Sequence, residues 1–329
     1  MRAIDVHAHY APRVMFERIA QRGDWFGARF EEELDGRRQL RVRGRKGVND
    51  PRFQWTLEDR VRDMDRIGTD FQVLSTAPVL YNYDIDADSG LASSRELNDD
   101  VARAVAEVPS RFAGLGSLPM QDIPMAVEEL RRCRSIGLLG VSLATNVNGR
   151  HWDEPEFGPL FAAAEETGAL LFYHANRGVL GPTLPRYHLE NTIGHPVEDS
   201  IAAASLILGG VLERHPDLKV VIAHGAGNLC FGIARIDRGW SVQPPADPKI
   251  SQLPSGYLRG LYYDCLTWGE PQLRFLVDQV GADRVVLGSD WPADMGPDSP
   301  GAWVGEMESI TDAEKELIFH TNLERLLGV

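Results

Sequence analysis

Two histidines two residues apart stand at the start of the chain, in Ile4-Asp-Val-His-Ala-His-Tyr10. Apolar and polar residues alternate here as in a β-strand, in which every second side chain faces the same side. His7 and His9 therefore fall on one side and could hold one metal ion together. A divalent ion such as zinc needs about three protein ligands and an open position before it can activate water. The remaining ligands must lie far along the chain.

Three further titratable residues each close an apolar run. They are His174 after Ala169-Leu-Leu-Phe-Tyr, His224 after Leu218-Lys-Val-Val-Ile-Ala, and Asp290 after Arg284-Val-Val-Leu-Gly-Ser. Taken singly, each could cap or stabilise a core. If the runs are parallel strands of a barrel, their carboxyl ends meet where such folds carry their chemistry. Together with His7 and His9, these residues predict a metal site.

The other histidines and the lysines narrow the type of site. His151, His188, His215 and His320 fall in loops or helices, and of this remaining group only His195, before a predicted helix, could still face the site. Binuclear barrel hydrolases bridge two metals with a carboxylated lysine at a strand end. The four lysines, Lys46, Lys219, Lys249 and Lys315, do not end a predicted strand. The site should therefore hold one metal ion.

The elements that would position these residues alternate along the chain. After the first strand we expect strands at 71–76, 112–118, 140–144, 169–174, 218–224, 261–264 and 284–290. We expect helices at 55–67, 91–108, 123–136, 156–167, 198–214 and 270–280, and one more helix after the strand at 218–224 that ends at about residue 238. Eight strands, seven intervening helices and further C-terminal helices predict a (β/α)8 barrel. A doubly wound open sheet is the alternative. The sequence contains no repeat or linker, so we expect one domain over residues 1–329.

Residues 11–54 interrupt the alternation. Asp35-Gly36 lies between Phe30-Glu-Glu-Glu-Leu34 and Gln39-Leu-Arg-Val-Arg43, which indicates a hairpin inserted after the first strand. The segment carries five arginines, Arg37, Arg38, Arg41, Arg43 and Arg45. A charge run is more often a solvated face, but these side chains could also reach over an active-site mouth.

Length and charge bound the class of protein. A chain of 329 residues with 43% hydrophobic residues can bury a core of barrel size. The formal charge of −14 argues against nucleic acid or an anionic membrane as partner, so the positive groups that would bind an anionic substrate must be local. Cys133, Cys230 and Cys265 are scattered, and we find no signal peptide and no apolar run of membrane-spanning length. We expect a soluble cytoplasmic protein.

The motifs as a set resemble the amidohydrolase superfamily and, more narrowly, its metal-dependent decarboxylase branch of the α-amino-β-carboxymuconate-ε-semialdehyde decarboxylase type. The resemblance rests on the two N-terminal histidines, His174, Val221-Ile-Ala-His-Gly-Ala-Gly227 and Leu287-Gly-Ser-Asp-Trp-Pro292. The narrower match adds Trp55 with Arg62-Asp-Met-Asp65, Val73-Leu-Ser-Thr-Ala-Pro-Val79, Leu118-Pro-Met-Gln121 and Ala234-Arg-Ile-Asp237. It runs from end to end and includes the insertion after the first strand.

The resemblance implies a barrel with one divalent ion, usually zinc, bound by the residues that match the family's ligands: His7, His9, His174 and Asp290. His224 matches a histidine beside the metal that works as acid or base. Arg235 matches an arginine that enters the neighbouring subunit's site and grips a substrate carboxylate, which implies a homodimer. An arginine of the insertion has a similar role in the family, and Arg41, Arg43 and Arg45 all remain candidates.

The sequence departs from the family pattern in the segments that would line the substrate pocket. The decarboxylase type has His-Pro-Trp-Asp after the fifth strand, whereas this chain has His174-Ala-Asn-Arg-Gly178. Where that type carries tryptophans, this chain has His188-Leu-Glu-Asn191, and Trp291-Pro-Ala-Asp-Met-Gly296 adds a carboxylate after Asp290. These changes keep the metal chemistry and leave the substrate open beyond a small unsaturated or aromatic acid.

The resulting hypothesis is a decarboxylase in which the metal polarises an oxygen of the substrate. His224 or Asp290 would move the proton, and Arg177 or Arg235 would orient the substrate carboxylate. The same site could instead serve a hydrolase or hydratase, in which activated water attacks an amide, lactone, imine or alkene. A protein whose metal only stabilises the barrel is a third reading. Zinc is the expected metal, and manganese, iron and cobalt also suit the ligand types.

Overall fold

The structure, a computed structural model, describes residues 1–33, 36, 38–176 and 183–328. Eight strands lie side by side in the order β1-β5-β6-β7-β8-β9-β10-β11, and each neighbouring pair is parallel. They are β1 Ile4–Tyr10, β5 Phe71–Thr76, β6 Phe112–Gly116, β7 Gly140–Ala144, β8 Leu170–His174, β9 Lys219–Ile222, β10 Tyr262–Asp264 and β11 Val285–Val286.

The two ends of this sheet are joined by backbone hydrogen bonds. Beyond β11 the chain runs alongside β1, where Val6 N donates to Leu287 O at 3.0 Å and Asp290 N donates to His7 O at 2.8 Å. Ala8 forms a parallel bridge with Trp291. These bonds close the sheet, so the predicted barrel is confirmed and the open doubly wound sheet is excluded.

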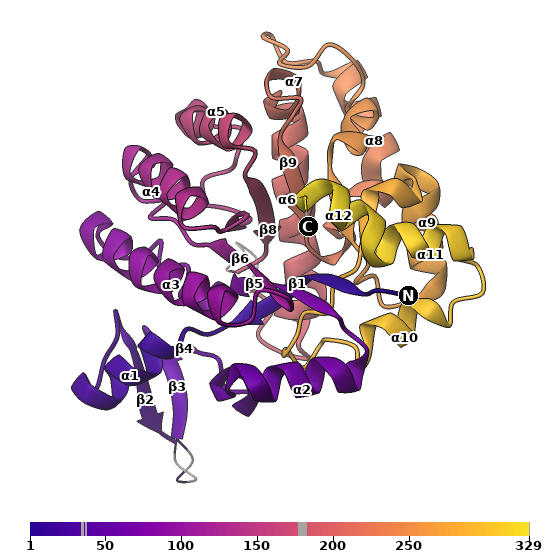
Figure 1. The fold of residues 1–329 in the computed structure, drawn as a ribbon. Helices are drawn as coiled ribbons and strands as arrows, with labels where there is room; N and C mark the ends of the chain where they lie inside the picture. Colours follow the sequence, from indigo (N-terminus) through magenta and orange to yellow (C-terminus); the bar gives the residue numbers. More distant parts are fainter. Residues whose placement is uncertain (34–35, 37, 177–182, 329) are drawn as a thin grey trace.

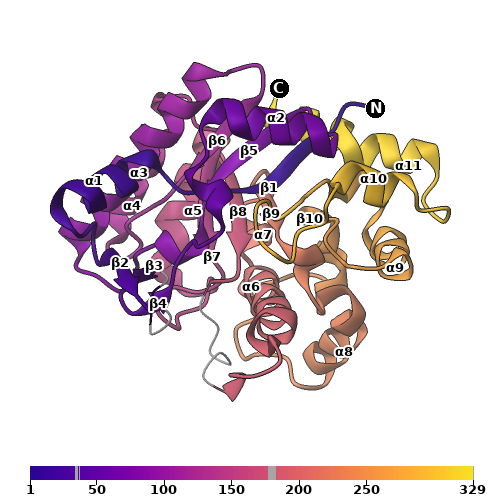
Figure 2. The ribbon, with the colours of Figure 1, turned by 90° about the horizontal axis from the view of Figure 1, so that it is seen from below.

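Helices follow the strands and surround them, as the view from below shows (Figure 2). They are α2 Leu57–Ile67, α3 Ala87–Glu107, α4 Ile123–Ser135, α5 Gly158–Thr167, α6 His195–Leu208, α7 Val211–Arg214, α8 Leu229–Val242 and α9 Glu270–Val280, then α10 Pro300–Gly305, α11 Asp312–Glu316 and α12 Asn322–Leu327. Local sequence sets their ends. Helix α2 begins with a capping box between Thr56 and Asp59 and ends at Gly68, whose φ of 73° is a left-handed conformation that favours glycine.

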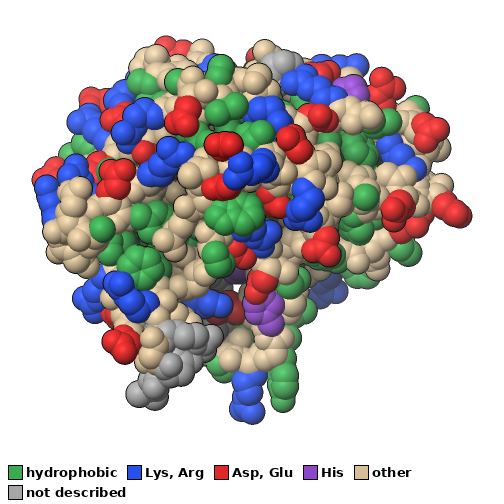
Figure 3. Space-filling view, turned by 60° about the horizontal axis from the view of Figure 1, so that its bottom comes forward, with side chains coloured by type: hydrophobic (Ala, Val, Ile, Leu, Met, Phe, Trp, Pro, Cys, Tyr) green, Lys and Arg blue, Asp and Glu red, His purple; other side chains and the backbone are tan. Residues whose placement is uncertain are grey.

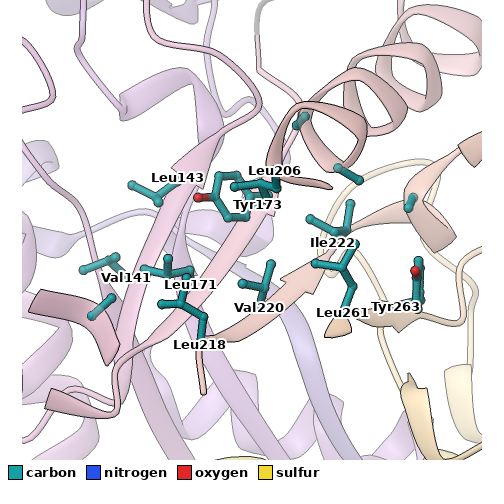
Figure 4. Close-up of a cluster of buried hydrophobic side chains, with 14 of the residues drawn as sticks. Val141, Leu143, Leu171, Tyr173, Leu206, Leu218, Val220, Ile222, Leu261 and Tyr263 are labelled. Carbon is teal, nitrogen blue, oxygen red and sulfur yellow. The ribbon is translucent and has the colours of Figure 1, made fainter. Parts of the chain in front are cut away.

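The hydrophobic side chains form an inner and an outer layer. Leu171 and Tyr173 of β8 belong to the cluster between strands and helices, where they lie near Leu206 of α6 (Figure 4). Leu170 and Phe172 belong to a separate cluster with residues of β1, β5 and β9. Because side chains alternate along a strand, His174 faces the same side as Phe172, at the carboxyl end of the barrel interior.

The insertion after β1 forms a small subdomain beside the barrel, drawn in indigo in Figure 1. It contains α1 Arg13–Arg22 and the antiparallel strands β2 Ala28–Glu32, β3 Arg38–Val42 and β4 Arg45–Lys46. The predicted hairpin is confirmed as β2 and β3, although its turn at Asp35 lies outside the described residues. Helix α1 and strand β4 were not predicted. The N-cap of α1 is Pro12, which makes no side-chain capping bond, and the helix buries only Met15 and Ile19, so its sequence signal is weak.

Several predicted boundaries are wrong. Strand β9 ends at Ile222, two residues before His224, and β11 ends at Val286, four residues before Asp290. The predicted helix 198–214 is divided into α6 and α7, because Gly210 adopts φ 67° between them. Beyond these strand ends the backbone is irregular, and His224 and Asp290 both have positive φ. The expectation of a single domain stays a prediction.

The surface carries charges of both signs. Figure 3 shows acidic and basic side chains interspersed over the face that it presents. Among the described residues, no helix combines the length and the apolar character needed to cross a bilayer.

Candidate metal and catalytic site

Four side chains meet at the carboxyl end of the barrel: His7, His9, His174 and Asp290. All four are buried, and one potential ligand atom from each lies within 4.8 Å of the others. Asp290 Oδ1 is 2.8 Å from His9 Nε2, 3.2 Å from His7 Nε2 and 3.9 Å from His174 Nε2. Ligand atoms that share one zinc ion, each about 2.0–2.2 Å from it, lie roughly 3.0–3.5 Å apart. The cluster therefore has the dimensions of a single-metal site.

The free nitrogens of the cluster also fit a metal. His7 Nε2 and His174 Nε2 are buried without a hydrogen-bond partner among the described residues, whereas His9 directs Nε2 to Asp290 Oδ1 and leaves Nδ1 without a partner. The second nitrogen of two rings is fixed: His7 Nδ1 lies 2.7 Å from Asp264 Oδ2, and His174 Nδ1 bonds to Ala175 O. Metal-binding histidines typically have one nitrogen held in this way, because the bond orients the other toward the ion. The residues present therefore fit a divalent cation.

The electrostatics of the cluster favour a cation. Burial lowers the pKa of His7, but the carboxylates of Asp264 and Asp290 outweigh burial and raise it to about 10. Burial lowers the pKa of His9, and lowers that of His174 well below its usual range. Burial alone would raise the pKa of Asp290, but the three imidazoles hold it well below the usual range of a carboxyl group. Without an ion, His9 and His174 are therefore neutral, Asp290 is ionised and His7 holds a proton, which it would release when a divalent ion binds.

His224 stands beside this cluster. Its ring centroid lies 5.0 Å from that of His174 and 5.3 Å from that of His7. Its Nδ1 is 2.8 Å from Asp199 Oδ2 of α6, which leaves Nε2 for the cavity. Burial lowers the pKa of His224, but the Asp199 carboxylate reverses this effect and raises it. His224 and Asp290 both have positive φ, 52° and 57°, which non-glycine residues adopt rarely and most often at functional sites.

A cavity of about 920 Å³ opens onto the cluster, lined by His9, His174, His224 and Asp290. On the insertion side its wall contains Arg45 and Lys46. Arg45 also pairs with Asp84 at 3.5 Å, and two further arginines of the insertion have acidic partners. Arg43 donates to Asn82 Oδ1 at 2.7 Å and pairs with Asp84 at 3.0 Å, and Arg41 pairs with Glu33. Arg177 lies outside the described residues.

A second hollow, of about 700 Å³, leads from His224 and Asp290 outward between α8 and α9. Its outer wall is apolar and exposed: Phe231 is 85% accessible, and its ring lies 6.3 Å from that of Phe275. Arg235 is exposed on α8, one turn beyond Phe231. In the isolated chain, the structure does not bring Arg235 into contact with the metal cluster.

The amidohydrolase family matches this chain over residues 4–329. The chain belongs to the amidohydrolase family. A relative from Dictyostelium discoideum, 2-amino-3-carboxymuconate-6-semialdehyde decarboxylase, is 37% identical over 84% of this chain and 77% of its own length. The same enzyme from Caenorhabditis elegans is 26% identical over 100% of this chain and 94% of its own length. The predicted family and its decarboxylase branch are confirmed, and with them the expected class, a carboxy-lyase.

Solved structures agree with this fold. The 5-carboxyvanillate decarboxylase of Sphingomonas paucimobilis superimposes with a TM-score of 0.84 at 24% identity, over 100% of this amidohydrolase and 99% of that chain. A dihydroxybenzoic acid decarboxylase from Polaromonas sp. JS666, with bound manganese and 2-nitroresorcinol, gives a TM-score of 0.80 at 20% identity over 100% and 97% of the two chains.

Three carboxylates that support the site of this amidohydrolase were not singled out from its sequence. Asp264, at the end of β10, accepts from Gly225 N and Leu266 N besides contacting His7. Asp199 contacts His224 and accepts from Ala175 N. Asp264 could have been found, because it ends an apolar strand as His174 does. Asp199 gives no such signal, since it lies within helix α6 and does not end an apolar strand.

Asp5, the third, shapes the strand that carries the histidine pair. Asp5 pairs with Gln72 and Ala8 with Leu74, so β1 advances three positions where β5 advances two, and the strand contains a bulge. The Asp5 carboxylate accepts from His7 N at 3.0 Å, within the bulge, and from Ser289 N and Oγ at 3.0 and 2.6 Å. The regular alternation predicted for this strand is therefore wrong between Asp5 and Ala8, although His7 and His9 do reach one site.

The site also needs close backbone approach. A Cβ atom at Gly288 would lie 3.0 Å from His7 Cβ and 3.1 Å from Asp264 Cβ. A larger residue would push apart the histidine and the carboxylate that orients it.

Proposed function

We propose that this amidohydrolase is a metal-dependent, non-oxidative decarboxylase of a small unsaturated or aromatic carboxylic acid. The observation that carries the proposal is the buried cluster of His7, His9, His174 and Asp290, which opens onto a cavity whose lining includes Arg45 and Lys46. The Dictyostelium relative, 37% identical, is a decarboxylase of an unsaturated acid. The relatives named above are all decarboxylases, so we prefer this reaction to the hydrolase and hydratase alternatives.

His7, His9, His174 and Asp290 would hold one divalent ion. A bound ion would supply Lewis-acid polarisation of a substrate oxygen. Three imidazole nitrogens and one carboxylate favour zinc, which we propose as the metal, and manganese is the alternative. Manganese is present in the Polaromonas structure.

Decarboxylation breaks the bond between the carboxylate carbon and the carbon that bears it. The electron pair of that bond stays on the bearing carbon, CO₂ leaves, and a proton must arrive at that carbon. We assign delivery of this proton to His224 Nε2, because Nδ1 is held by Asp199 and the ring lines the cavity. The Asp199 carboxylate stabilises the imidazolium form, so that His224 carries the proton before the reaction.

Arg45 is the arginine of the insertion best placed to hold the substrate carboxylate, since it lines the cavity and Arg41 and Arg43 do not, and it also pairs with Asp84 at 3.5 Å. A guanidinium group offers two parallel N–H donors that match the two oxygens of a carboxylate. Arg177 stays a candidate from the sequence alone.

The proposal includes a homodimer in which Arg235 lies near the neighbouring site. Phe231 and Phe275 leave an apolar surface exposed beside the second hollow, and a second copy of the chain would remove this surface from water. Arg235 follows Phe231 on α8 by one turn, so a helix that covers the hollow would carry its arginine toward the site. A cytoplasmic location and a small anionic substrate complete the proposal. All three cysteines are buried free thiols, which agrees with a reducing compartment.

The test is a search for CO₂ release from metal-loaded protein over a panel of hydroxybenzoic, picolinic and aminocarboxymuconate-type acids. A decarboxylase releases CO₂ and leaves a product with one carboxylate fewer. A hydrolase would instead produce a new carboxylate or amine without gas, and that outcome would replace the proposal with the alternative.

A further inference from the structure

The His195 ring contacts the ring of His174, a member of the metal cluster. His195 is the first residue of α6 and follows a π-helical segment, Glu190–Gly194. Its side chain lines the same cavity as His174 and His224, with ring centroids 6.4 Å from each. It is not one of the four clustered ligand residues. Rings at this separation are in contact, so a substrate atom would lie in the cavity that the three rings line and not between them.

His195 has unused hydrogen-bonding capacity. Within the part of the chain that the structure describes, neither ring nitrogen has a protein hydrogen-bond partner. In its uncharged form the ring offers one donor and one acceptor. A partly buried imidazole without a protein partner has its hydrogen bonds available for a ligand.

Asn191 is a second uncharged side chain on this wall, next to Glu190, which also lines the cavity. Asn191 lies four residues before His195, about one helical turn, and lines both the cavity and the second hollow. Its amide also has no side-chain partner among the described residues. The wall formed by the insertion is different, because Arg45 and Lys46 there are cationic. The cavity therefore offers charge to one part of a ligand and uncharged hydrogen bonds to another.

We infer that His195, assisted by Asn191, determines substrate specificity by hydrogen-bonding a hydroxyl or carbonyl oxygen of the substrate, while Arg45 holds the carboxylate. The inference rests on the proposed function for the identity of the site, but it concerns recognition and not the reaction step. A neutral donor and acceptor suits an uncharged oxygen, whereas a second carboxylate at this position would be buried without a countercharge.

The test compares ligand binding by zinc-loaded wild type and His195→Met, which keeps the bulk and removes both hydrogen-bonding atoms. The probes are benzoate and its 2-, 3- and 4-hydroxy derivatives, with dissociation constants measured by calorimetry. In wild type, we expect at least one hydroxyl position to tighten binding about five- to tenfold over benzoate. His195→Met should lose that gain and bind benzoate as wild type does. His195→Gln should restore most of the gain, because an amide also donates and accepts.

The control is His188→Met, a change of the same type at an exposed histidine on the same segment, which should keep the wild-type pattern. Equal hydroxyl gains in His195→Met and wild type would overturn the inference. So would the absence of any gain in wild type, or an equal loss for benzoate and hydroxybenzoates, which would indicate a packing role. Binding requires no turnover, so a failure to release CO₂ would refute the proposed reaction without affecting this result.

Discussion

The Nδ1 atom of His7 lies 2.7 Å from Oδ2 of Asp264, and both side chains are completely buried. Asp264 also accepts from Gly225 N, in the turn that contains His224. One carboxylate thus orients a proposed metal ligand and the loop of the proposed acid. We predict that Asp264→Asn lowers metal affinity about 10- to 100-fold, because the ligand ring loses its fixed orientation and basicity.

The measurement for Asp264 is chelator competition on the purified protein, with circular dichroism to verify folding. Asp278→Asn is the matched control, because that aspartate lies on the surface of α9 and pairs with Arg274. Unchanged metal affinity in Asp264→Asn would refute the orienting role.

For His224, we predict that replacement by Asn lowers kcat by about 10²- to 10⁴-fold, since a general acid contributes a factor of this order. Metal content should stay at the wild-type value, because His224 is outside the cluster of four ligand residues. Asp199→Asn should give a smaller loss, as it removes only the carboxylate that holds Nδ1. Steady-state kinetics and metal analysis on the same samples make the test. Substantial activity in His224→Asn would exclude it as the proton donor.

Arg45 should act in binding. We predict that Arg45→Met raises KM about 10- to 100-fold, because one charged hydrogen-bonding partner of the carboxylate is lost, with a smaller change in kcat. Arg41→Met is the control, since Arg41 belongs to the same small sheet but pairs with Glu33. If the two variants have the same KM, the carboxylate is held elsewhere, and Arg177 and Arg235 become the candidates.

A pH effect on stability should come from Glu314, which caps α11 and receives two hydrogen bonds from Arg274 of α9. The Arg274 guanidinium lowers the pKa of Glu314 to about 2 from its ordinary value of 4.5. A lowered folded-state pKa contributes stability that is complete above pH 4.5 and is lost as the pH falls toward 2. We predict that Glu314→Gln lowers the Tm of the metal-free protein by about 2 °C at pH 7.

The Tm difference between wild type and Glu314→Gln should shrink steadily between pH 5 and pH 3. Glu316→Gln serves as control, because that residue is on the same helix and has no ion pair among the described residues. A difference that is constant with pH would show that the carboxylate charge contributes nothing.

Much of this architecture could be predicted because it follows from hydrophobic periodicity. Strand β5 and helix α9 match their predicted ranges, as each is a continuous apolar or amphipathic run with clear breakers on both sides. His7, His9, His174 and Asp290 could be brought together because parallel strands end at one edge. What could not be predicted depends on contacts between segments far apart in sequence, such as Asp199 with His224 or Arg43 with Asp84.

Irregular backbone conformations also could not be predicted from the sequence. The bulge at Asp5 and the positive φ of His224 and Asp290 are imposed by hydrogen bonds from other strands, and local sequence carries no mark of them. Helix α1 was missed because its start lacks a capping side chain. The choice of Arg45 among the arginines of the insertion required knowing which side chains line the cavity, which only the folded chain provides.

The most direct test of the central claim relates CO₂ release to metal occupancy. The protein is stripped with a chelator, shown by circular dichroism to remain folded, and titrated with zinc or manganese while CO₂ from a turned-over acid is recorded. We predict that the rate rises with occupancy and saturates at one ion per chain, and that Asp290→Asn stays inactive at every metal concentration. CO₂ release that persists in the stripped protein, or full activity in Asp290→Asn, would contradict the account.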